Sequence, residues 1–143
     1  MVKFLLAVDG SACSLRAVEQ AIARRARYRH PEACEVHLVN VQAAISSDIS
    51  RFLTHEQLAV YYRETSEKAL QAARARADAA GITCIVHCEI GVPAEAIARL
   101  AETLSCDEIV MGSNGRSAFS EFLVGSITLK VVQLTKIPVL LVK

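Results

Sequence analysis

Two kinds of hydrophobic spacing alternate along this chain, and one of them predicts five strands. Short apolar runs, several rich in β-branched residues, recur between turn residues, which is typical of strands buried in a parallel sheet. The predicted strands are residues 3–8, 35–41, 82–90, 108–111 and 139–142. The first, KFLLAV, is almost wholly apolar and leads into Asp9, Gly10 and Ser11, as a buried strand that enters a turn does.

Helical spacing occupies the segments between these strands. From Ser14 onward apolar residues recur every three or four positions, with Ser11 or Ser14 available as the N-cap, arginines at 24–29 near the carbonyl end, and Pro31 as the stop. Further helices are predicted at residues 56–80, from 93 to about 104, and at 127–134. Residues 43–54 show no clean period and predict a mobile connection.

This alternation specifies an α/β fold, because parallel strands require crossover connections. We expect residues 1–143 to form a single-domain three-layer sandwich, a five-stranded, mainly parallel sheet flanked by four helices. In such sheets ligands bind beyond the carboxyl ends of the strands, at the point where the strand order reverses. The turns after the first, second and fourth strands are therefore the places to search.

Composition and charge narrow the classes of function. Sixteen Lys and Arg against fifteen Asp and Glu give a net charge of +1, so overall charge attracts the chain neither to nucleic acid nor to anionic membrane, and we expect neither as a partner. No apolar run approaches the roughly 20 residues of a membrane span, and the first residues lead straight into a strand without a cleavage site. We expect a cytoplasmic protein.

Cysteine and histidine follow no metal-ligand pattern. The five cysteines contain no CxxC pair, and the four histidines are spread over different elements, so we predict reduced, mostly buried thiols and no zinc site. Cys84 and Cys88 share one face of a strand but lie about 13 Å apart along it, too far for a disulfide. His37 and His87 are expected to be surface or packed polar residues, and Cys13, near a helix start, is the thiol to test for reactivity.

The most informative segment is MGSNGRSAFSEFLVGS, residues 111–126. Gly112 and Gly115 follow a strand, and Gly125 and Ser126 begin a helix, whose free N–H groups and partial positive charge favour anions. The first two glycines alone would more often be a turn, but with Gly125 and Ser126 they favour a phosphate-binding loop. No Gly-Lys-Ser/Thr of a Walker A loop and no compact GxGxxG is present, so kinase-like chemistry is disfavoured.

The spacing of this segment resembles that of the universal stress proteins. Their ATP-binding members carry glycine, two residues, glycine, nine residues, then glycine with serine or threonine, as Gly112, Gly115, Gly125 and Ser126 do here. The resemblance extends over the whole chain, from VDGS at 8–11 through GVP at 91–93 to Pro138 and the final VLLV. One departure is Asn114, where many members have His.

The resemblance implies an ATP site. Asp9, which follows Val8, would lie near the ribose or a phosphate-bound Mg or Mn, and the backbone of Val41 would read the adenine edge. The residues implied to line ribose and phosphates are Met111, Gly112, Gly115, Gly125, Ser126 and Ile127. Arg116 either pairs with a phosphate or is a solvated loop residue, and Asp9 either serves the ligand or caps the turn after the first strand.

The leading hypothesis is an ATP-binding stress-response or regulatory protein that acts through nucleotide-linked stability or partner binding. The resemblance also implies a homodimer through the C-terminal strand, unless its shortness and Lys143 protect that edge.

No catalytic residue is identified, because the glycine segment has no acidic neighbours beyond Asp9 and Glu121 and no nucleophile pairs with His. An adenylyl or phosphoryl transfer enzyme, or a slow ATPase, is the alternative, and would need a substrate pocket from residues 43–62. A phosphoacceptor receiver domain is disfavoured by the single Asp9 and by Gly91 after the third strand.

Overall fold

A five-stranded sheet in which every pairing is parallel forms the centre of the computed structural model, which describes residues 1–114 and 124–143. The strand order is β3-β2-β1-β4-β5. The bounds are β1 Val2–Ala7, β2 Cys34–Gln42, β3 Cys84–Ile90, β4 Glu108–Gly112 and β5 Val139–Val142. The chain moves outward from β1 through β2 to β3 and then returns to the other side of β1, so the order reverses between β1 and β4.

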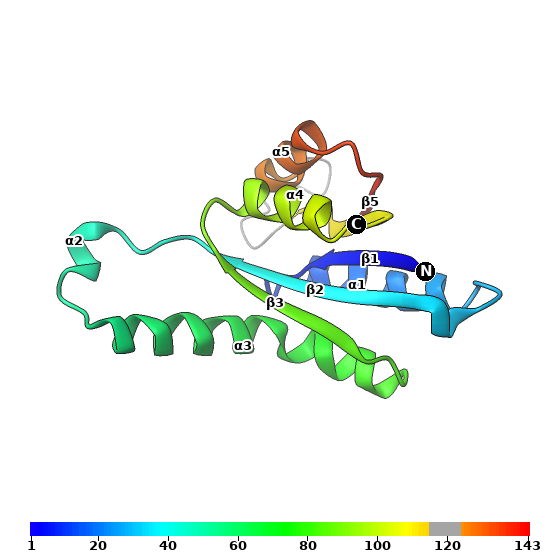
Figure 1. The fold of residues 1–143 in the computed structure, drawn as a ribbon, viewed down its shortest axis with the longest axis horizontal. Helices are drawn as coiled ribbons and strands as arrows, with labels where there is room; N and C mark the ends of the chain where they lie inside the picture. Colours follow the sequence, from blue (N-terminus) through cyan, green and yellow to red (C-terminus); the bar gives the residue numbers. More distant parts are fainter. Residues whose placement is uncertain (115–123) are drawn as a thin grey trace.

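Helices cover both faces of this sheet, which confirms the predicted three layers. In Figure 1, α1 (Ala12–Arg25) and α3 (His55–Ala79) lie below the sheet and α4 (Pro93–Thr103) and α5 (Ser126–Leu134) lie above it. A short helix, α2 (Ser47–Ser50), and a 3-10 turn at Pro31–Ala33 complete the described elements.

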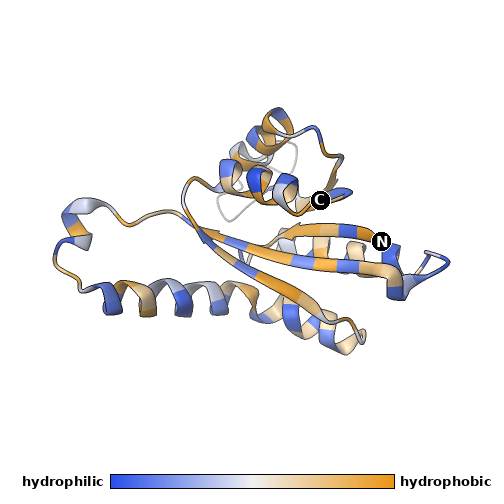
Figure 2. Ribbon diagram, in the orientation of Figure 1, coloured by the Kyte–Doolittle hydropathy of each residue, from blue (hydrophilic) through white to orange (hydrophobic). Residues whose placement is uncertain are grey.

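Successive residues of a strand point to opposite faces of the sheet and pack into two separate hydrophobic cores. Phe4 and Leu6 of β1 pack with residues of α1 and α3, whereas Leu5 packs with residues of α4 and α5, and each of the three is at most 1% exposed. Full burial of such a side chain contributes about 1.5–3 kcal/mol. Figure 2 shows the strands as mainly hydrophobic ribbons, as a sheet covered on both faces requires.

The helix ends follow local sequence signals. Ser11 caps α1 by accepting a hydrogen bond from the N–H of Ser14, as one of the two predicted caps. Thr54 and Gln57 form a reciprocal capping box at the start of α3, and Gly81, with φ +68°, ends it in the left-handed conformation.

Three boundary predictions need correction. The predicted connection at 43–54 contains the four-residue α2, a fifth helix that does not flank the sheet. The third strand begins at Cys84 and not at residue 82, because the N–H of Ile82 donates to Ala77 O and closes the end of α3. Helix α1 ends at Arg25, so Arg27 and Arg29 lie beyond it.

Within the described residues, no helix combines the length and apolar character needed to cross a membrane.

Candidate functional site

The carboxyl ends of β1, β2 and β4 meet at one edge of the sheet, and most of the described candidate residues lie at this edge. Because the strands are parallel, Val8 and Asp9 after β1, Val41 near the end of β2, and Met111 with Gly112 at the end of β4 all fall there. The N–H of Val8 donates to Val39 O at 2.9 Å and continues the pairing of β1 with β2. This is the crevice where the strand order reverses.

Asp9 shapes the turn that leaves β1. One of its carboxylate oxygens, Oδ1, accepts a hydrogen bond from the N–H of Ser11 at 2.9 Å. The described part of the chain offers no second partner to this half-buried carboxylate. The capping role considered from the sequence is therefore present, and it uses only one of the two oxygens.

Gly112 brings the end of β4 against the first turn of α1. A Cβ at this position would lie 2.8 Å from Sγ of Cys13, and 3.0 and 3.1 Å from the carbonyl carbon and oxygen of the same residue. Only glycine permits this approach without a shift of the neighbouring chain. Cys13 is 8% exposed, and its thiol donates to Val142 O at 3.2 Å.

The start of α5 is attached to the same strand end. The N-cap residue Gly125 donates its N–H to Ser113 O at 2.7 Å, and Oγ1 of Thr128 donates to Gly112 O at 3.0 Å. This helix has a glycine N-cap, so its N-cap residue has no side chain to cap it. Its first turn, with Ser126 and Ile127 exposed, therefore carries backbone N–H groups and the positive end of the helix dipole beside β4, which favours an anion.

Asn40 is a site residue that the sequence analysis missed. It is 2% exposed, and its Nδ2 donates to Val8 O at 2.8 Å, while its Oδ1 accepts from Oγ of Ser66 at 2.9 Å and from Nε2 of Gln42 at 2.6 Å. The signal available in the sequence was a single amide within the apolar run VHLVNV.

Two candidate residues, Gly115 and Arg116, lie outside the described residues, as does Glu121. The predicted phosphate loop is thus described at its two ends, where Gly112 and Gly125 are linked through Ser113 and Thr128.

A second polar cluster joins β2 to β3 and contains none of the candidate residues. His37, only 3% exposed, has Nδ1 at 2.9 Å from Nε2 of His87 and Nε2 at 2.6 Å from Oε1 of Glu35. Burial, reinforced by His37, lowers the pKa of His87, and Glu89 opposes this shift. His37 is thus the packed polar residue that was expected, and among the described residues no three His, Cys, Asp or Glu side chains gather as a metal site would require.

All five cysteines are unpaired, as predicted. Cys13, Cys34 and Cys106 are buried, Cys84 is half-buried and Cys88 is exposed. Burial raises the pKa values of the Cys84 and Cys106 thiols, which makes both poor nucleophiles.

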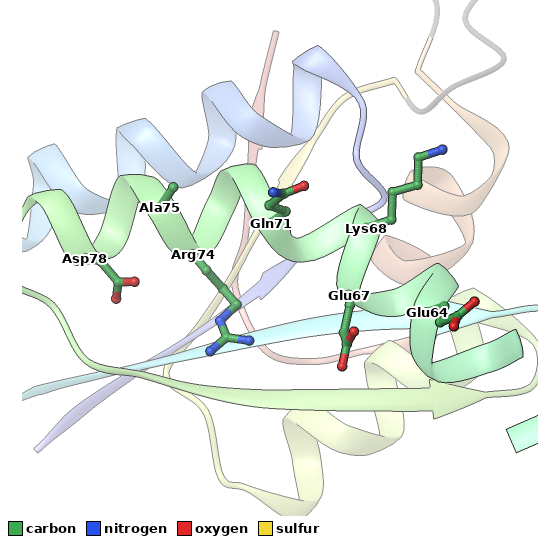
Figure 3. Close-up of a pocket in the computed structure, with 7 residues that line it drawn as sticks. All are labelled: Glu64, Glu67, Lys68, Gln71, Arg74, Ala75 and Asp78. Carbon is green, nitrogen blue, oxygen red and sulfur yellow. The ribbon is translucent and has the colours of Figure 1, made fainter. Parts of the chain in front are cut away.

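A surface groove along α3 is separate from the candidate site. Its lining comes from that helix alone and carries both signs of charge, as Figure 3 shows: Glu64, Glu67, Lys68, Gln71, Arg74, Ala75 and Asp78. None of these residues belongs to the set predicted from the sequence.

Comparisons with known proteins agree with this geometry. The model of the universal stress protein family matches residues 1–143. Universal stress protein MJ0531 of Methanocaldococcus jannaschii is 30% identical over 143 residues, which cover 99% of this chain and 81% of that protein. The solved structure of hypothetical protein MJ0577, whose biochemical function was assigned from structure, superposes with a TM-score of 0.83 at 26% identity and covers 99% of this chain and 95% of the other. A universal stress protein in complex with cAMP superposes with a TM-score of 0.72 at 27% identity, over 99% and 97% of the two chains.

Proposed function

Because the chain belongs to the universal stress protein family, we propose that it binds an adenine nucleotide, ATP, at the carboxyl ends of β1, β2 and β4. In this proposal nucleotide occupancy regulates the stability of the domain or its binding to a partner in a stress response. The observation that carries it is the start of α5, whose N-cap is a glycine without a capping side chain and which two hydrogen bonds attach to the end of β4. A relative of known structure was solved in complex with cAMP, which supports an adenine nucleotide as the ligand.

The candidate residues divide among the parts of the ligand. The backbone N–H groups of Ser126 and Ile127 would bind phosphate oxygens, together with Gly115 and Arg116 from the loop, while the N–H of Gly125 attaches the helix start to Ser113 O. Asp9 would face the ribose or, through its second oxygen, a Mg or Mn ion held by the phosphates and water. Val41 would offer backbone groups to the adenine edge, and Val8, Met111 and Gly112 would line the crevice.

Linkage gives this binding a regulatory consequence. A ligand that binds only the folded protein stabilises it by about 2.7 kcal/mol when present at 100 times its dissociation constant. The ligand would contact β1, β2, β4 and α5 together. Its binding would therefore stabilise elements that pack into both hydrophobic cores.

We also propose that the protein is a homodimer that pairs through β5. Among the described strands, β5 stands at the edge of the sheet beside β4, and Leu141 is 36% exposed. A short apolar edge strand has backbone groups able to pair across a two-fold axis. The unpaired cysteines fit a reducing compartment, which supports the cytoplasm as its location.

A substitution at Gly125 tests the phosphate end of the site. Gly125 has φ −62° and ψ 152°, which other residues adopt without strain, so Gly125→Asp should cap α5 and maintain or raise the melting temperature. The same carboxylate would repel the phosphates, so calorimetry should show ATP affinity reduced at least about tenfold and adenosine affinity unchanged. Gly125→Asn is the matched control, because it caps the helix without the charge and should retain more of the ATP affinity. If the wild type bound no adenine nucleotide up to millimolar concentration, the proposed function would be wrong.

A further inference from the structure

Helix α3 holds the end of β2 at two points, one on each side of Val41. Oγ of Ser66 donates to Oδ1 of Asn40 at 2.9 Å, and the hydroxyl of Tyr62 accepts the N–H of Ile45 at 2.8 Å. Tyr62 and Ser66 are four residues apart and therefore lie on the same face of α3. The segment between the two contacts contains the backbone groups proposed to read the adenine edge.

Asn40 replaces a backbone hydrogen bond of the sheet. Val8 donates to Val39 O, which places the backbone groups of Val39 and, two residues on, those of Val41 on the β1 side of β2. Continued parallel pairing would join the N–H of Val41 to Val8 O. Val8 O instead accepts from Nδ2 of Asn40 at 2.8 Å. On the β1 side of β2, no described backbone group forms a hydrogen bond with the N–H or C=O of Val41.

The orientation of the Asn40 amide is fixed by its surroundings. Its oxygen accepts from Ser66 and from Gln42, so the nitrogen must face Val8. A buried amide with partners on three sides strongly resists rotation, because any other orientation leaves buried polar atoms unpaired. Asn40 thus links β2 both to α3 and to the peptide bond that precedes Asp9.

We propose that Asn40 is a positioning residue for the adenine end of the nucleotide site. It ends the pairing of β1 with β2 at Val8, and so leaves the N–H and C=O of Val41 directed into the crevice beside the Asp9 turn. This inference rests on the proposed function. An N–H donor and a C=O acceptor match the ring nitrogen and the amino group of adenine, whereas guanine presents N–H and carbonyl groups in the opposite sense, so Asn40 would support selection of ATP over GTP.

The decisive variant is Asn40→Asp, with Ser66→Ala as its control. Asn40→Asp is nearly isosteric and keeps an oxygen for Ser66 and Gln42, but it replaces the donor to Val8 O with an acceptor, while Ser66→Ala keeps that donor and removes the contact with α3. We expect calorimetry to show the dissociation constant for ATP raised about tenfold in Asn40→Asp and less than threefold in Ser66→Ala.

The ratio of ATP to GTP affinity separates positioning from general destabilisation. Added negative charge and lost stability weaken the binding of both nucleotides alike, so only a displaced Val41 lowers the ratio of ATP to GTP affinity. We expect this ratio to fall in Asn40→Asp and to stay constant in Ser66→Ala. Asn40→Ser, whose side chain is too short to reach Val8 O, should show the same fall and serves if the aspartate variant does not fold. An unchanged ratio in a folded Asn40 variant would overturn this inference alone. Absence of ATP binding by the wild type would overturn the proposed function and this inference with it.

Discussion

The tight contact between Gly112 and Cys13 predicts a specific stability defect. In Gly112→Ala the new methyl group would lie 2.8 Å from Sγ and about as close to the backbone carbonyl of Cys13, at 3.0 and 3.1 Å. The thiol lies in the first turn of α1, is buried and is hydrogen-bonded to Val142 O, so it cannot simply rotate away. The end of β4 or the first turn of α1 must move instead.

The cost should be that of an overpacked core. Inserting a methyl group where there is no room costs about 1–3 kcal/mol, which for a chain of this size lowers the melting temperature by about 3–9 °C. Urea unfolding of the wild type and the variant measures this difference directly.

A double-mutant cycle identifies the cause of the defect. Cys13→Ala removes Sγ and leaves the backbone contacts, so it should rescue Gly112→Ala in part, with a coupling energy of about 1 kcal/mol. The control is Gly81→Ala, where φ is +68° and nothing lies within 4 Å of the new methyl group. Its cost, about 1–2 kcal/mol of backbone strain, should be independent of Cys13. Additive effects of Gly112→Ala and Cys13→Ala, or wild-type stability of Gly112→Ala, would refute the steric reasoning.

Two further predictions concern pH and assembly. Because the pKa of His87 is lowered in the folded protein, its contribution to stability is complete above the ordinary histidine value of about 6.5 and is lost as pH falls through the folded value. The free energy of urea unfolding should therefore decrease between pH 7 and 5 in the wild type and less in His87→Gln, and parallel profiles would contradict this. Light scattering at micromolar concentration should give about twice the chain mass of 15.5 kDa, and Leu141→Lys should shift the protein toward monomer; a monomeric wild type would contradict pairing through β5.

The sequence predicted the strands well because β1, β2 and β4, which helices cover on both faces, leave mainly apolar runs, and the edge strands β3 and β5 are also rich in apolar residues. All five were located, and their ends were missed by at most two residues. The larger error, at Ile82, has a tertiary cause: this residue is 5% exposed and apolar like the strand that follows, but its N–H closes helix α3. Hydrophobicity alone cannot separate a buried helix end from a buried strand start.

Candidate residues that act through backbone geometry were more accessible to sequence reasoning than those that act through side-chain contacts. The close approach of Gly112 to α1 requires glycine, so the residue type alone indicates this geometry in the sequence. The bonds of Asn40 to Val8 and Ser66 span 32 and 26 residues, and the contact of His37 with His87 spans 50. Such pairs depend on the register of neighbouring strands and on how α3 lies across the sheet, and no local pattern specifies either.

Hydrogen bonds directly connect the proposed nucleotide site to β5, the proposed dimer edge. Ser113, which follows Gly112 and accepts the N–H of Gly125, donates its own N–H to Val142 O at 2.7 Å, and the thiol of Cys13 reaches the same oxygen at 3.2 Å. A ligand that fixes the start of α5 against β4 would therefore also fix the last residue of β5. By linkage, a gain in dimer stability caused by nucleotide equals the gain in nucleotide affinity caused by dimerisation. In the proposed function, these hydrogen bonds would transmit nucleotide occupancy to the edge of the sheet.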